Sequence, residues 1–234
     1  MRLGLPASMG LAASTKKERL ATEQDRGEPR RVQLRHESRL TAVEYVKQKA
    51  WEGASLQQCP LHPEGGCGIA RHGTYVRVEP PGMEIARWYC KPGHTTFSLL
   101  PDCLAAKLSS TLAAVETVVD AVERRESSIE ALAEKLRPDI GVQGAVRWVR
   151  RRVVAITLAM VALKGLQPDV LSGVGATQGE VRAALKVDAV LAAARELAGT
   201  QVAHLPPYVG FGARHRGVKT AKRRAQHQAG ADPP

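Results

Sequence analysis

The chain has 234 residues, of which 44% are hydrophobic but only 4% are aromatic. So few aromatic residues argue against a large β-sandwich and favour helices rich in alanine, leucine and valine. Lysine and arginine exceed the acidic residues and give a formal net charge of +11. This excess favours polyanionic partners, first nucleic acid and then acidic membrane surfaces.

Neither a membrane span nor a secretion signal is expected. The most apolar run, residues 153–163, is much shorter than the roughly 20 residues that cross a bilayer. Pro6 and Gly10 interrupt the apolar patch near the N-terminus. The four cysteines therefore indicate reduced thiols or a bound metal rather than disulfides. We expect a cytoplasmic protein, associated with the nucleoid in a bacterium.

The first 35 residues are expected to be disordered, and a helix is expected after them. Residues 1–35 show hardly any periodic apolar pattern, which predicts disorder. Over residues 36–58 we expect a lead-in helix, because apolar side chains recur at helical spacing at Leu40, Val43 and Val46. Trp51 is expected to pack against the element that follows.

The next segment, residues 59–100, gathers thiol and imidazole groups at its two ends. Two β-prone runs, 74–78 and 85–89, flank the turn signal Pro80-Pro81-Gly82 and predict a β-hairpin. Such a hairpin would bring the cysteines at the beginning of the segment beside those at its end. Two soft-ligand clusters joined in this way are typical of a zinc ribbon.

The expected ligands of a structural Zn²⁺ are Cys59, Cys67, Cys90 and His94. Cys90 and His94 form a C-x3-H knuckle, and Cys67 is followed by the glycine that permits a tight turn around a metal. Cys59 and His62 have the two-residue spacing of a regular knuckle, so His62 is the leading substitute for Cys67 or His94. A closed four-ligand site would supply folding free energy on the order of 10 kcal/mol. The sequence contains no HExxH-type motif and no evident nucleophile–base pair, so we do not expect an enzyme.

Residues 101–200 predict a helical domain, because their apolar positions recur at helical spacing. A first helix is expected directly after Pro101 and Asp102, with Cys103 as a core thiol. A final helix is expected over 180–198, and the segment 201–234 is predicted to be a loop followed by a basic tail.

Within this domain, residues 127–152 have the proportions of a helix-turn-helix. A capping box over 127–130 predicts a short helix over 129–136. After a break at Pro138, apolar residues at alternating steps of four and three predict a longer helix over 142–163.

Arginines crowd the second helix of this pair, and we expect them to contact DNA. Arg147 and Arg151 are expected to read bases, beside Trp148, whereas Arg150 and Arg152 are expected to bind phosphates. The alternative interpretation is a solvated charged face. Further backbone contacts are expected from the ribbon arginines Arg71, Arg77 and Arg87, and from the tail residues Arg214, Arg216, Lys219, Lys222, Arg223 and Arg224.

The ordered set of these features resembles the N-terminal region of insertion-sequence transposases and related transposon-derived proteins. The residues that match are Cys59-Pro60, Cys67-Gly68, Arg71-His72-Gly73, Tyr75, Arg77, Arg87-Trp88-Tyr89-Cys90 and Thr96-Phe97-Ser98. The resemblance covers about residues 59–152 and departs from the pattern in a stretched first knuckle that carries a histidine. It implies recognition of transposon ends or an operator-like site, with a transposase or other mobile-element proteins as partners. The residues after the helix pair are too few for the nuclease domain of a full transposase, so we expect no strand transfer.

The sequence thus predicts a mainly α protein with a small β zinc ribbon, followed by a helical domain that contains a helix-turn-helix. We expect it to bind duplex DNA sequence-specifically, as a regulator or as the recognition component of a mobile element. One alternative is a protein-interaction module of a larger nucleoprotein complex. Another is a single-strand or RNA binder that stacks bases on Tyr75, Trp88 and Tyr89.

Overall fold

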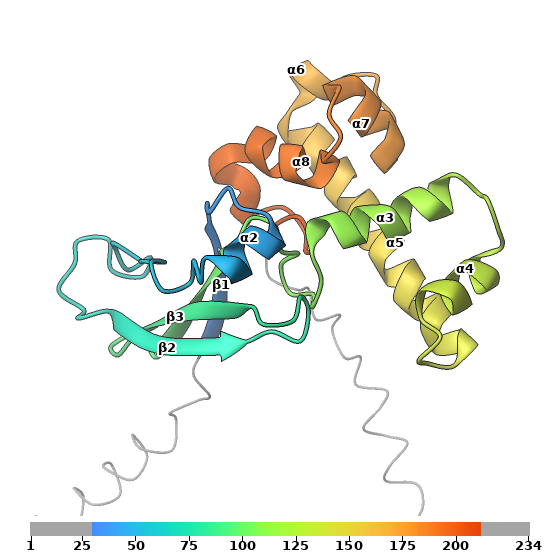
Figure 1. Ribbon diagram of the computed structural model, residues 1–234. Coiled ribbons are helices and arrows are strands. Elements are labelled where there is room, and N and C mark those ends of the chain that lie inside the picture. The colour runs from blue at the N-terminus through green and yellow to red at the C-terminus, as the bar shows by residue number, and fades with distance from the viewer. Residues whose placement is uncertain (1–29, 212–234) are drawn as a thin grey trace, which may run out of the picture.

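A computed structural model describes residues 30–211 and contains, in that range, a four-stranded sheet, seven α-helices and one 3-10 helix. Figure 1 shows the sheet and helix α2 on one side of the molecule and the other helices beside them, with α4 farthest from the sheet. The expected combination of many helices with a small sheet is confirmed. The expected disorder of residues 1–29 and the basic residues 214–224 lie outside the described residues.

The sheet has the strand order β1-β4-β3-β2. The strands are β1 (Arg30–His36), β2 (Ala70–Val76), β3 (Glu84–Cys90) and β4 (Thr95–Pro101). Strands β2 and β3 form the predicted hairpin, and β4 continues the antiparallel pairing. Strand β1 pairs in parallel with β4, with Val32 opposite Phe97. Residues 30–35 are therefore in a strand, and their expected disorder was wrong.

The lead-in helix is shorter than expected. Helix α2 (Ala42–Lys47) covers only part of residues 36–58, and a capping box between Thr41 and Glu44 fixes its first turn. Its buried residue is Tyr45, whose ring centre lies 6.0 Å from that of Trp51. Both rings pack against residues of the sheet, which confirms the position expected for Trp51.

The first helix of the helical domain begins about ten residues later than expected. Helix α3 (Leu112–Glu123) is capped by Thr111, whose side chain accepts a hydrogen bond from the backbone of Ala114. Before it, Lys107 has a φ of +59°, a left-handed conformation that a continuous helix does not permit. Residues 102–110 instead form a loop that packs against the sheet through the buried Leu104.

The two helices of the predicted helix-turn-helix are present with nearly the expected bounds. They are α4 (Ile129–Leu136) and α5 (Val142–Leu166). Ser128 caps α4 by accepting from the backbone of Ala131. The capping box expected over 127–130 was therefore wrong, because the cap is Ser128 and its third successor is an alanine. Valines of α3 and α5 and alanines of α4 and α5 form one small core, which packs these three helices together.

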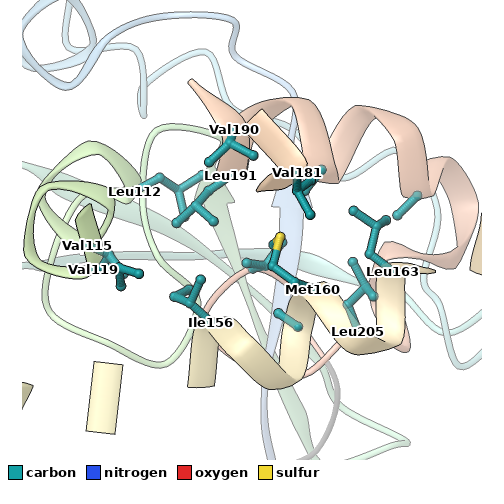
Figure 2. Packing of buried hydrophobic residues seen from close by; sticks show 14 of the residues in the cluster. Leu112, Val115, Val119, Ile156, Met160, Leu163, Val181, Val190, Leu191 and Leu205 are labelled. Atoms are coloured by element: carbon teal, nitrogen blue, oxygen red, sulfur yellow. The ribbon is translucent and has the colours of Figure 1, made fainter. Parts of the chain in front are cut away.

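The remaining helices complete the largest core. They are α6 (Pro168–Leu171), α7 (Gln178–Leu185), α8 (Val190–Ala198) and the 3-10 helix η1 (Gly199–Ala203). Figure 2 shows Ile156, Met160 and Leu163 of α5 facing residues of α3, α7 and α8. The single helix expected over 180–198 is divided because Lys186 ends α7 in a left-handed conformation, with a φ of +54°.

Arginines join the helices to the sheet. Arg195 of α8 is fully buried and donates hydrogen bonds to four carbonyl oxygens, those of Asp102, Leu104, Tyr208 and Val209. Arg35 of β1 pairs with the Asp102 carboxylate at 2.8 Å and also with Glu196 of α8. No helix within residues 30–211 is both long and apolar enough to cross a lipid bilayer.

Candidate metal centre and nucleic-acid interface

Three cysteines and one histidine meet where the hairpin approaches the loop that precedes it. The four residues are Cys59, His62, Cys67 and Cys90, and their ligand atoms all lie within 4.8 Å of one another. Cys59 and His62 face each other across a tight turn, closed by a backbone hydrogen bond of 3.0 Å from the His62 amide to the Cys59 carbonyl. Cys67 follows two glycines with positive φ, and Cys90 ends β3.

The separations among these atoms suit tetrahedral coordination. The His62 Nδ1 atom lies 3.5 Å from the Cys59 sulfur and 3.4 Å from the Cys90 sulfur. Ligand bonds of about 2.0–2.3 Å in a tetrahedron place the ligand atoms about 3.3–3.8 Å apart. The four residues can therefore hold a metal ion with only small movements.

The site is enclosed. Cys59 and Cys90 are buried, with 2% and 0% of their surface exposed, and they pack with Phe97 of β4. The backbone amide of Gly93 donates to the Cys90 sulfur at 3.4 Å. A Cβ at Gly93 would lie 2.6 Å from Cδ1 of Leu61 and 3.3 Å from that sulfur, so the second turn of the site accommodates glycine best. With four protein ligands and no open position, the arrangement is structural in type.

Electrostatics favour a thiolate at Cys59. Burial raises the pKa of the Cys59 thiol, but hydrogen bonds from the His62 ring and the Leu61 backbone outweigh it, and the pKa is lowered to about 7. Burial raises the pKa of the neighbouring Cys90 thiol. Thiolate is the form that binds metals, so a first ligand is available near neutral pH.

His94, the expected fourth ligand, does not belong to this group, and His62 takes its place. The turn that joins β3 to β4 gives His94 a φ of +42°, and its Nδ1 lies 3.4 Å from the hydroxyl of Tyr89. His94 is exposed, whereas His62 is partly buried beside the sulfurs. The expected ligands Cys59, Cys67 and Cys90 are brought together.

Two of the three arginines of the hairpin region bind carbonyl groups of the protein itself. Arg71 donates to the carbonyl oxygens of Trp51 and Glu52, each at 2.7 Å, and so holds the loop after α2. Arg77 is buried and donates to the carbonyl of Leu108. Arg87 is partly buried, and its Nε is enclosed without a hydrogen-bond partner. Arg71 and Arg77 thus have structural partners within the protein, and contact of the three arginines with a DNA backbone stays a prediction.

The arginines of α5 divide into two groups. Arg147, Arg150 and Arg151 are exposed, and their steps of three and four residues return to one side of the helix. Arg152 is buried, and its guanidinium lies 3.5 Å from the centre of the Trp148 ring. Trp148 is itself half-buried, so neither Arg152 nor Trp148 lies on the exposed side where DNA contacts were expected.

A groove borders the exposed side of α5. Its volume is about 1460 Å³, and residues of the β2–β3 turn, the loop before α3, α5 and the segment after η1 line it. The charged residues in its lining are four arginines and one glutamate: Arg137, Arg150, Arg151, Arg152 and Glu79. The groove is therefore basic.

Comparison of the chain with protein-family models, with curated proteins and with solved structures found no match. The metal-ligand geometry and the basic helix face therefore carry the functional argument by themselves, and the resemblance to insertion-sequence transposases remains a proposal.

Sequence reasoning missed the groove and the role of Arg195. The signal for His62 was present in its two-residue spacing from Cys59. The groove had no such signal, because its walls come from five segments between residues 78 and 208. Arg195 reads as one more charge on an amphipathic helix, and only the fold surrounds it with carbonyl groups.

Proposed function

We propose that this protein is a duplex-DNA-binding protein stabilised by one structural Zn²⁺. Three thiolates and one imidazole in a closed tetrahedral arrangement are a ligand set that zinc favours. The ion would join the loop after α2 to the end of β3 and so contribute to folding rather than to chemistry. Metal analysis of the purified chain, with one equivalent of zinc expected, tests this part of the proposal.

The observation that supports DNA binding is the row of exposed arginines on α5. The opposite side of the helix packs against α3 and α4, so Arg147, Arg150 and Arg151 are held on a rigid support. A helix that is packed on one side and lined with guanidinium groups on the other suits the major groove, where arginine pairs with guanine edges or phosphates. We propose that α4 and α5 act as a helix-turn-helix in a transcriptional regulator or a transposon-associated recognition component.

Selection of bound sequences from a random duplex pool tests DNA recognition. The full-length, zinc-loaded chain should enrich a defined sequence, and the double variant Arg147→Ala/Arg151→Ala should lose this preference. Arg124→Ala is the matched control, because Arg124 is also exposed but lies at the end of α3. Its selection should match that of the unchanged chain. If no sequence is enriched, or if the control behaves like the double variant, sequence-specific recognition by α5 is excluded.

A second candidate function, a protein-interaction module, is favoured by the apolar end of the same helix. Val154, Leu158 and Val161 are each more than half exposed, and their spacing continues the side that carries the arginines. For this function, binding of a defined partner would be lost in Leu158→Asp and retained in the Arg147→Ala/Arg151→Ala variant. Duplex binding that is retained in Leu158→Asp and lost in the Arg147→Ala/Arg151→Ala variant would support the first proposal.

A further inference from the structure

The groove beside α5 contains a buried cation that lacks an ionic partner. Arg152 has 5% of its surface exposed and lines the groove. Its Nη1 donates to the carbonyl of Trp148 at 3.1 Å, and its Nε is buried without a hydrogen-bond partner. Among residues 30–211, no carboxylate lies within ion-pair distance of Arg152, whereas the neighbouring Arg137 pairs with Asp139 at 2.6 Å.

A buried guanidinium is costly unless a counter-charge and hydrogen-bond acceptors meet it. The Trp148 ring, 3.5 Å away, provides a cation–π contact and covers one side of the group. That contact supplies no acceptor for Nε. Arg150 and Arg151 line the same groove, so the surroundings add positive charge. Glu79 is the only acidic residue in the described lining, and its charge acts on Arg152 without forming an ion pair. An anion in the groove would therefore meet Arg152 without displacing an ion pair.

The rest of the lining indicates what the anion is attached to. Val154 and Leu158 of α5 line the groove together with Pro206, Pro207 and Tyr208 of the segment after η1. Apolar and aromatic side chains of this kind accept a flat, weakly polar group such as a nucleobase. The described volume of about 1460 Å³ exceeds that of common small-molecule sites, so a nucleotide and its neighbours fit.

We propose that this groove binds a nucleotide, with its phosphate at Arg152 and Arg151 and its base against the apolar wall formed by Val154, Leu158 and Tyr208. The phosphate belongs either to a free nucleotide or to an unpaired nucleic-acid strand, and both present the same phosphate ester. The inference shares Arg151 with the proposed duplex recognition, but Arg147, which would also read a duplex, does not line the groove.

Binding of defined probes to the full-length, zinc-loaded chain tests the inference. The probes are AMP, adenosine, inorganic phosphate and single-stranded hexathymidylate, measured by calorimetry and by quenching of tryptophan fluorescence. AMP or hexathymidylate should bind at least tenfold more tightly than adenosine or phosphate, since either alone makes only half of the contacts. AMP binding assigns the groove to free nucleotides, whereas binding of hexathymidylate alone assigns it to a strand.

Two variants and a matched control locate the site. Arg151→Ala changes an exposed residue and should weaken probe binding at least tenfold without loss of structure. Arg152→Met should weaken it further, with circular dichroism and thermal melting as the check on folding. Arg147→Ala, which removes an equal charge from the same helix outside the groove, should change probe affinity by less than twofold.

Three results would overturn the inference: no probe with a phosphate binds, adenosine binds as tightly as AMP, or Arg147→Ala weakens binding as much as Arg151→Ala. Arg151 takes part in both proposals, so Arg147, which only duplex recognition requires, distinguishes the two tests. If the probes bind but no duplex sequence is enriched, the proposed function is refuted and the groove assignment stands. If a duplex sequence is enriched but no probe binds, the groove assignment is refuted and the proposed function stands.

Discussion

Replacement of Arg195 by methionine should destabilise the protein more than any change on its exposed surface. The guanidinium of Arg195 donates to four carbonyl oxygens. Of these four, the oxygen of Tyr208 has another donor, the backbone amide of Ala106 at 2.9 Å. The other three would lose the donor they have. At about 1–3 kcal/mol for each buried unsatisfied group, their loss costs about 3–9 kcal/mol.

Methionine also relieves a cost, because a desolvated cation is no longer buried. Burial lowers the pKa of Arg195 to about 10, which shows the direction of that cost. A net loss of about 3–5 kcal/mol in the free energy of unfolding is expected, as for other broken buried polar networks. That is a large part of the roughly 5–15 kcal/mol that stabilises a typical domain.

Urea unfolding of the zinc-loaded chain at pH 7, followed by circular dichroism, measures this loss. Arg147→Ala is the control, because an exposed arginine with no ion pair should change the free energy of unfolding by less than about 0.5 kcal/mol. A loss below about 1 kcal/mol for Arg195→Met would show that water satisfies the carbonyl groups. Arg195 would then not be the link between the helices and the sheet.

Three further predictions concern the metal site and one helix cap. His62→Ala should abolish stoichiometric zinc binding, whereas His94→Ala should leave it intact; the metal content of both variants after dialysis against a weak chelator decides between the two histidines. Gly93→Val should weaken zinc affinity at least tenfold by crowding the nearest ligand sulfur, as competition with a chromogenic chelator will measure. Thr177→Ala removes the cap of α7 and should cost about 1 kcal/mol at pH 7. Hydrogen bonds from Thr177 lower the pKa of Glu180 from 4.5. The stabilisation from these bonds is therefore present above the unfolded-state pKa of Glu180 and lost as the pH falls through its folded-state pKa. The free energies of unfolding of Thr177→Ala and of the parent should differ less at pH 3 than at pH 7.

The elements that were predicted well are those whose signals are local. Helix α5 carries a regular apolar seam over twenty residues, and its bounds follow from that seam and from the break at Pro138. The β2–β3 hairpin follows from two β-prone runs around one turn. In both cases, the residues that make the contacts are close in sequence, so periodicity and turn signals contain the required information.

The elements that were missed depend on distant partners. Strand β1 pairs with β4 more than sixty residues later, and its alternation of Val32 and Leu34 with polar residues is too short to stand out from its surroundings. The choice of His62 over His94 depends on which way the turn after Cys90 faces. The groove that Arg152 lines is shared with residues 203–208, about fifty positions later in the chain. The charge and spacing of residues in the sequence therefore cannot predict the strand pairing, the choice of histidine or the surroundings of Arg152.

The pairing of β1 with β4 has a practical consequence for anyone who shortens this protein. The cysteine pattern suggests an independent metal-binding fragment that begins near residue 59, but such a fragment would leave β4 with an unpaired row of backbone amide and carbonyl groups. Phe97 and Leu99 would lie along that bare edge, and exposed edges of this kind recruit strands from neighbouring molecules. A soluble, crystallisable fragment should therefore begin at or before Arg30, while one that begins at Cys59 should precipitate even when saturated with metal.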